Sequence, residues 1–244
     1  MMNIKLTLEY DGTDYHGWQV QPNGKTIQDV LEHALQEILQ EKVRLHGSGR
    51  TDAGVHAMGQ VANLVCSRDI DLWKLQRGLN GLTSRDIVVK KAETVSDSFD
   101  ARRDARKRVY EYRIWNHPWP SVFHRRFVYH VHYALNRSAM EEAMGVLEGE
   151  HDFSSFQASG CDAAHPIRRI YRNSIEMRDN LLVFRIEANA YLRHMVRNIV
   201  GTVIEVGREE RSPADMAKLL MAKDRTQAGP TAPPQGLFLV EVEY

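Results

Sequence analysis

The sequence predicts an α+β protein built from two halves that contain the same kinds of elements. From Ile4 to Tyr10, apolar and polar residues alternate, which is typical of a strand with one buried face. After Thr26, apolar residues recur every three or four positions, which is typical of an amphipathic helix. Both patterns return in the second half of the chain, so we expect two compact α+β halves with a cleft between them.

In the first half, the strand over 4–10 is followed by a turn at Asp11-Gly12-Thr13. Thr26 and Asp29 form a capping pattern for the first helix. The apolar stripe of this helix consists of Ile27, Val30, Leu31, Ala34, Leu35, Ile38 and Leu39. We then expect a strand over 61–65, a second helix over 72–82 and a strand over 87–95.

The second half begins with an alternating strand over 108–115, so we place the halves at 1–107 and 108–244. Ser138 is the expected cap of the next helix. The remaining expected elements are strands over 167–177 and 181–188, a long helix carrying Leu192 to Ile204, a helix opened by Ser212-Pro213, and a closing strand over 236–244.

The composition of the 244 residues, 43% of them hydrophobic, is that of an ordinary globular protein. No apolar run approaches the roughly 20 residues that cross a bilayer, and the start lacks a secretory signal pattern, so we expect a cytoplasmic protein. The two cysteines, Cys66 and Cys161, are far apart and have no zinc-site spacing. The 11 histidines show no metal-binding pair on a helix, so we expect neither a disulfide nor a metal.

The formal net charge is zero, but the basic residues are concentrated between Ala101 and Tyr133, with eight Arg or Lys against two acids. Aromatic residues are interleaved there at Tyr110, Tyr112, Trp115 and Trp119. This combination favours RNA, which is recognised through phosphate contacts and stacking, over a merely solvated surface. The candidates for RNA backbone contacts are Arg102, Arg103, Arg106, Lys107 and Arg108.

One carboxylate, Asp52, lies between glycines in the string Gly49-Arg50-Thr51-Asp52-Ala53-Gly54-Val55-His56-Ala57. Glycine allows tight turns and close approach of a substrate, and the nearby Arg50 favours an ionised, oriented carboxylate. An ionised carboxylate suits work as a nucleophile or a base. Asp-Ala-Gly is also common turn chemistry, so a reactive site and an ordinary turn both fit this string.

Several blocks, in one order along nearly the whole chain, make it resemble the TruA family of pseudouridine synthases, which act on the anticodon arm of transfer RNA. The blocks are Tyr10-Asp11-Gly12-Thr13, Gly17-Trp18-Gln19, the Asp52 string, Tyr110-Glu111-Tyr112, Met195 to Gly201, Gly229 to Pro233 and Gly236-Leu237. The resemblance implies two α+β halves, each with an antiparallel sheet covered by helices, and an RNA-binding cleft between them.

The same resemblance implies roles for four residues. Asp52 is the catalytic nucleophile, and Tyr110 packs on the target uracil. Arg50 contacts RNA and helps to hold the target nucleotide out of the stack, and Arg197 pairs with Asp52. The implied reaction converts uridine to pseudouridine on the 3′ side of the anticodon stem-loop without a cofactor. The family also implies a homodimer with transfer RNA lying across both subunits.

Three other classes of protein stay open at this point. An RNA-binding or chaperone protein would keep the RNA surface and have an inactive site. A phosphate-binding enzyme could use Gly47-Ser48-Gly49 as a cradle, although the Gly-Lys-Ser/Thr ending of a P-loop is missing. A glycoside hydrolase would need a second carboxylate within about 5 to 10 Å of Asp52.

Overall fold

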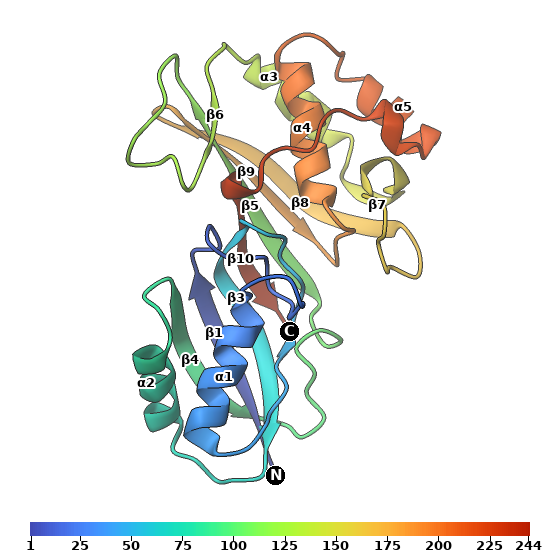
Figure 1. Ribbon diagram of the computed structural model, residues 1–244. Helices are drawn as coiled ribbons and strands as arrows, with labels where there is room; N and C mark the ends of the chain where they lie inside the picture. Colours follow the sequence, from blue (N-terminus) through green and yellow to red (C-terminus); the bar gives the residue numbers. More distant parts are fainter. The chain divides into compact units, whose positions relative to one another are not determined.

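The computed structural model describes residues 1–244, which form two compact units (Figure 1). The first unit consists of Met1–Arg106 together with Phe238–Tyr244, and the second of Lys107–Leu237. The predicted α+β class is confirmed. The last strand was expected in the second half, but its residues 238–244 belong to the first unit, because this strand pairs in parallel with a strand there (Phe238 opposite His56).

The first unit is a sheet in the order β4-β1-β3-β10, with the short β2 paired to β3. Its elements are β1 (Met2–Tyr10), α1 (Ile27–Leu39), β2 (His46–Gly47), β3 (His56–Cys66), α2 (Leu72–Leu82), β4 (Ile87–Val95) and β10 (Leu237–Glu243). β1 pairs antiparallel with both β3 and β4, and its inward residues Ile4, Leu6 and Leu8 are fully buried. The helix α1 lies over this sheet and packs against α2 (Figure 1).

The first helix begins where the capping pattern predicted. The Thr26 side chain accepts a hydrogen bond from the Asp29 backbone N–H at 3.3 Å, which satisfies one of the unpaired amides at the helix start. The predicted apolar stripe is confirmed by the full burial of Ile27, Leu31 and Leu35. The helix ends at Gln40, which adopts a left-handed conformation with φ of 55°.

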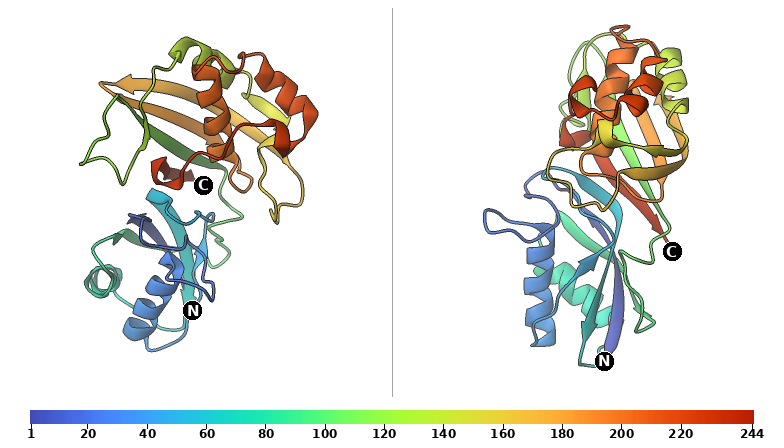
Figure 2. Two further views of the ribbon diagram at one scale, coloured as in Figure 1. Left: turned by 45° about the horizontal axis from the view of Figure 1, so that its top comes forward. Right: turned by 90° about the vertical axis from the view of Figure 1, so that its right-hand side faces the viewer.

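The second unit is a sheet in the order β5-β9-β8-β7, antiparallel along this path, with the short β6 paired in parallel to β5. Its helices α3, α4 and α5 lie together on one face of the sheet (Figure 2). The strands and helices are β5 (Lys107–Asn116), β6 (Tyr129–Val131), α3 (Arg137–Gly145), β7 (Gly149–Asp152), β8 (Ile167–Arg178), β9 (Leu181–Ala188), α4 (Met195–Gly207) and α5 (Asp215–Ala222).

Two helix starts in this unit differ from the predictions. Asn136, not Ser138, caps α3, because its side-chain oxygen accepts from the Ala139 backbone N–H at 3.1 Å and Ser138 already lies in the first turn. The helix α4 begins at Met195, so Leu192 lies in the turn before it, where its carbonyl accepts from the Met195 N–H at 3.1 Å.

Two further features of the fold are the length of its helices and the grouping of side chains that could bind a metal. No helix of this chain combines the length and the apolar character needed to cross a membrane. No group of three or more His, Cys, Asp or Glu side chains is arranged so that it could hold a metal ion.

Candidate functional site

Asp52 lies in the loop between β2 and β3, and this loop makes a tight turn directly after it. The Val55 backbone N–H donates to the Asp52 carbonyl at 3.1 Å. Gly54 within the turn has φ of +75°, a conformation that favours glycine. The turn leaves Asp52 half-buried, so the carboxylate is supported by the fold while it stays within reach of a ligand.

The residue before Asp52 fastens the loop to the sheet. Thr51 is buried, and its hydroxyl lies 2.8 Å from the hydroxyl of Tyr10 at the end of β1. Burial raises the pKa of Tyr10 to about 12, although hydrogen bonds from Thr51 and Gln60 act in the opposite direction. The Thr51 carbonyl accepts from the Trp18 N–H at 3.0 Å, so both sides of this residue are fixed.

Two glycines of the N-terminal blocks provide the space in which this loop lies. A Cβ atom on Gly12 would lie 2.0 Å from the Val55 carbonyl oxygen, and one on Gly17 would lie 2.6 Å from that of Thr51. Gly17 also has φ of +86°. The blocks at 10–13 and 17–19, recognised from the sequence by resemblance alone, therefore act as the structural support of the Asp52 loop.

Gln60 is a buried residue that the sequence analysis did not single out, and it fixes the start of the loop. Its amide donates to the Gly49 carbonyl at 3.0 Å, and its oxygen accepts from the Ser48 hydroxyl at 2.8 Å. On the other side of the turn, the His56 ring stacks on Phe238 of β10 with centroids 4.7 Å apart. No sequence pattern distinguishes a single Gln within an alternating strand, so the role of Gln60 could not be predicted.

In the second unit, Tyr110 lies in β5 opposite Ile186 of β9 and is 8% exposed. The ring of Tyr191 contacts it edge-on, with centroids 4.9 Å apart and planes at 78°. The Tyr191 hydroxyl donates to the Ile186 carbonyl at 2.7 Å, so the contacting ring is itself fixed. Tyr112 is fully buried and donates to the Pro233 carbonyl at 2.7 Å.

Arg197 lies in the first turns of α4 and is held by the segment that precedes β10. Its Nε donates to the Ala232 carbonyl at 2.8 Å, and the Ala232 N–H returns a bond to the Arg197 carbonyl at 3.1 Å. This segment can lie so close because a Cβ on Gly201, one turn along the helix, would be 1.7 Å from the Pro230 carbonyl oxygen. The Gly229 to Pro233 block therefore positions Arg197.

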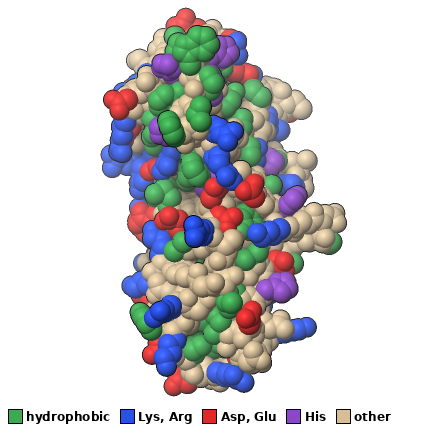
Figure 3. All heavy atoms as spheres, turned by 60° about the vertical axis from the view of Figure 1, so that its left-hand side comes forward, with side chains coloured by type: hydrophobic (Ala, Val, Ile, Leu, Met, Phe, Trp, Pro, Cys, Tyr) green, Lys and Arg blue, Asp and Glu red, His purple; other side chains and the backbone are tan.

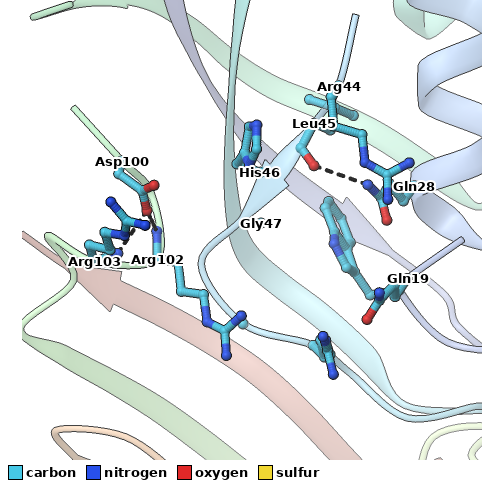
Figure 4. Close-up of a pocket in the computed structure, with 12 residues that line it drawn as sticks. Gln19, Gln28, Arg44, Leu45, His46, Gly47, Asp100, Arg102 and Arg103 are labelled. Carbon is cyan, nitrogen blue, oxygen red and sulfur yellow. Dashed lines mark hydrogen bonds between the residues drawn. The ribbon is translucent and has the colours of Figure 1, made fainter. Parts of the chain in front are cut away.

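Beside the Asp52 loop, the first unit contains an open groove of about 540 Å³ that is lined mainly by polar and cationic side chains (Figure 4). The groove brings together Arg50 with Arg102 and Arg103, three residues that the sequence analysis had assigned to RNA contacts. The full lining is Trp18, Gln19, Gln28, Arg44, Leu45, His46, Gly47, Gly49, Arg50, Asp100, Arg102 and Arg103.

Arg44 and His46 are groove residues that the sequence analysis missed. His46 belongs to β2, which is only two residues long and pairs with β3 at Asn63, so no periodic pattern marked it. Arg44 lies 3.2 Å from a carboxylate oxygen of Glu32 and remains exposed. Their place in the groove depends on pairing with a distant strand, which a local pattern does not reveal.

Asp100 is the one acidic residue in the groove lining, and its carboxylate binds the backbone of Arg102 and Arg103. Its carboxylate accepts from the backbone N–H groups of Arg102 and Arg103 at 2.9 and 2.8 Å. Burial opposes its ionisation, but these two N–H groups, together with the charges of Arg103 and His46, hold the pKa of Asp100 below its ordinary value. The carboxylate therefore orders the segment that presents the two guanidinium groups.

The five basic residues predicted to contact RNA fall into two groups. Arg102, Arg103 and Arg106 are exposed in the first unit. Lys107 lies 3.1 Å from Glu187, and Arg108 is only 9% exposed and donates to the Asn189 carbonyl at 2.9 Å. The last two therefore serve the second unit's own structure, because the strand β5 has already begun at Lys107.

Residues 7–103 and 143–244 match the family described as tRNA pseudouridine synthase. The chain belongs to the tRNA pseudouridine synthase family. It is 44% identical over 244 residues to the tRNA pseudouridine synthase A of Thermoanaerobacter sp. (strain X514), with full coverage of both chains. It is 45% identical to that of Myxococcus xanthus (all of this chain, 92% of the other) and 46% identical to that of Citrifermentans bemidjiense (100% and 98%).

Among solved structures, one described as an H/ACA RNP bound to a substrate RNA containing 2′-deoxyuridine matches at a TM-score of 0.39 and 12% identity, over 82% of this chain and 44% of that one. The assignment to the synthase family therefore depends on the sequence match. Membership makes the chain an isomerase of uridine in transfer RNA, and the TruA-type resemblance inferred from the blocks is confirmed.

Proposed function

We propose that this chain converts uridine to pseudouridine in the anticodon stem-loop of transfer RNA, with Asp52 as the nucleophile. The reaction breaks the bond between N1 of uracil and C1′ of the ribose and forms one between C5 and C1′. N1 gains a proton and C5 loses one, so the atoms balance without an oxidant, a reductant or an energy donor. The Asp52 carboxylate, on a loop fixed by its neighbours, is the group this chain offers for such a step.

The observation that carries this proposal is the construction of the Asp52 loop. Thr51, Gly54 and Val55 fix the backbone on both sides of Asp52, while the residue itself is left half-buried beside a cationic groove. A turn that merely joined two strands would need neither buried anchors nor two glycines making room for it. Such support of a reacting group is how an active site keeps it in position.

The other functional residues are assigned as follows. Tyr110 packs on the target uracil, which suits a ring held by an edge contact with Tyr191. Arg50 contacts the RNA from the groove and helps to hold the nucleotide out of the stack, and Arg197, fixed by Ala232, pairs with Asp52. We further propose a cytoplasmic homodimer that carries transfer RNA across both subunits.

The phosphate contacts are assigned to the exposed groove residues Arg44, Arg102 and Arg103 and to Arg106, which is exposed in the same unit. Guanidinium groups match phosphate geometry and supply the salt-dependent part of RNA affinity. Lys107 and Arg108 are left out of this set, because Lys107 pairs with Glu187 and the buried guanidinium of Arg108 is engaged with Asn189.

The test is site-resolved mapping of pseudouridine in unmodified transfer RNA after incubation with wild-type protein or with Asp52→Asn. We expect the wild type to convert uridines on the 3′ side of the anticodon stem-loop, and Asp52→Asn to lose at least about a thousandfold in rate, as expected when the reacting group itself is removed. Both proteins should bind the RNA with similar affinity.

A matched control is Asp14→Asn, which removes another carboxylate from the same unit and should leave the rate unchanged. If Asp52→Asn retained wild-type conversion, the nucleophile assignment would be wrong. If the wild type bound transfer RNA and converted no uridine, the chain would be an RNA-binding protein of this family with an inactive site.

A further inference from the structure

The loop between β5 and β6, residues 117–128, presents a cluster of large apolar side chains to water. Trp119, Val122 and Phe123 are 75%, 76% and 91% exposed. Single exposed apolar residues are normal on a protein surface, but several within five positions indicate an interaction site. Figure 3, which brings the left-hand side of Figure 1 forward, shows hydrophobic, histidine, basic and acidic side chains mingled in the upper part of the view.

The loop is ordered by hydrogen bonds within itself, so the exposure of Trp119, Val122 and Phe123 does not result from a loose backbone. The Trp115 indole donates to the Trp119 carbonyl at 3.0 Å, and the Trp119 N–H lies 3.1 Å from Nδ1 of His117. The rings of Trp115 and His124 stack with centroids 5.3 Å apart and planes at 25°. Pro118 and Pro120, with their fixed φ, further reduce its freedom.

The loop segment itself is basic, although Arg113 and Arg137 at its flanks pair with Glu111 and Glu141. From Tyr112 to Met140 the sequence contains no Asp or Glu, while it contains Arg113, Arg125, Arg126 and Arg137. Arg125 is exposed and lies two residues from Phe123. Exposed aromatic rings beside arginines are the combination by which proteins hold unpaired nucleotides, through base stacking and phosphate contacts.

The loop directly follows β5, the strand that contains Tyr110. Asn116, at the end of β5, lies six positions after Tyr110, which is roughly 20 Å at the rise of an extended strand. The loop therefore begins well away from Tyr110, and one bound RNA of ordinary size can reach both.

We propose that residues 117–128 form a second RNA-binding surface, on which unpaired bases of the substrate transfer RNA stack against Trp119 and Phe123 while Arg125 contacts a phosphate. This inference rests on the proposed function, because it takes transfer RNA as the substrate. It assigns the loop to capture and placement of the RNA and leaves the chemical step to the Asp52 loop.

The experiment compares Trp119→Ala/Phe123→Ala with Trp119→Leu/Phe123→Leu, which keeps apolar surface but removes the rings. Binding of an unmodified transfer RNA transcript is measured by fluorescence anisotropy at fixed salt. Both variants should raise Kd roughly 5- to 100-fold, the effect expected for loss of base stacking. The conversion rate at saturating RNA should stay unchanged. The control is Trp73→Ala, which removes a 63% exposed indole from the first unit and should change Kd by less than about twofold.

An unchanged Kd in both double variants would overturn the proposal, as would full binding by the leucine variant, because stacking needs the rings. Light scattering is run on the same proteins. If only the alanine variant changed the oligomeric state, the loop would be a contact between copies of the chain, and the proposal would be wrong. The binding measurement needs no catalysis, so it gives its answer even if the wild type converts no uridine.

Discussion

At the scale of single residues, Asp52 is positioned mainly by residues distant in the sequence. Its neighbour Thr51 is anchored by Tyr10 and Trp18, and two glycines leave room for the loop backbone. The sequence marked this turn as a candidate site because glycine, arginine and aspartate share one short string, although an ordinary turn fitted the string equally well. It did not reveal why Gly12 and Gly17 stand where they do, since their close contacts join segments about 35 to 45 residues apart, which local patterns do not encode.

The glycine at position 17 gives a prediction at this scale. Gly17→Ala should lower the free energy of unfolding by about 1 to 3 kcal/mol, because the added Cβ meets the Thr51 carbonyl and the positive φ disfavours alanine. The rate of pseudouridine formation should fall as well, since the loop backbone must shift. Urea unfolding and a conversion assay measure the two effects.

The control is Gly81→Ala in α2, where an added Cβ would meet no atom within 4 Å. This change should stabilise the protein by up to about 1 kcal/mol, because alanine favours a helix over glycine. Equal effects of the two substitutions would show that Gly17 is not a point of close backbone approach.

At the scale of elements, long periodic segments were predictable and short ones were not. The helices α1 and α2 and the strands β4 and β9 match their predicted ranges to within about a residue, because each repeats its apolar pattern several times. The strands β2, β6 and β7 have two to four residues, which is too few for any period to show. The missed groove residues Arg44 and His46 follow from this, since β2 brings them into place.

The cap of α3 gives a prediction for an element. Asn136→Ala should destabilise the protein by about 1 kcal/mol, because the Ala139 N–H at the helix start loses its acceptor. Ser138→Ala, at the position that the sequence pattern favoured, should change stability by less than about 0.5 kcal/mol. Thermal or urea unfolding measures both, and a larger loss for Ser138→Ala would contradict the assigned cap.

At the scale of the whole molecule, the formal net charge of zero hides a strongly cationic groove in the first unit. Affinity for RNA depends on where charges lie, because each phosphate contact releases counterions locally. Composition could exclude a uniformly basic protein, and it could mark residues 101–133 as basic. It could not separate Arg102 and Arg103, which line the groove, from Arg108, which is buried in the second unit.

The groove predicts how binding of transfer RNA responds to salt. In a plot of log K against log salt concentration, Arg102→Ala and Arg44→Ala should each reduce the slope by about 0.7 to 0.9, the value for one lost phosphate contact. Lys74→Ala removes an exposed charge from α2, outside the groove, and should leave the slope unchanged. A slope that changed equally in all three variants would mean that the groove has no special role.

The order in which the chain is made has a consequence for the first unit. Because β10 completes its sheet, this unit stays one strand short while the ribosome translates the whole of the second unit. Throughout that interval, the edge of β3 at His56 lacks its parallel partner, and the His56 ring lacks Phe238. The sheet that carries the Asp52 loop is thus completed last, and it reaches its full set of strands only once the whole of the second unit has been synthesised.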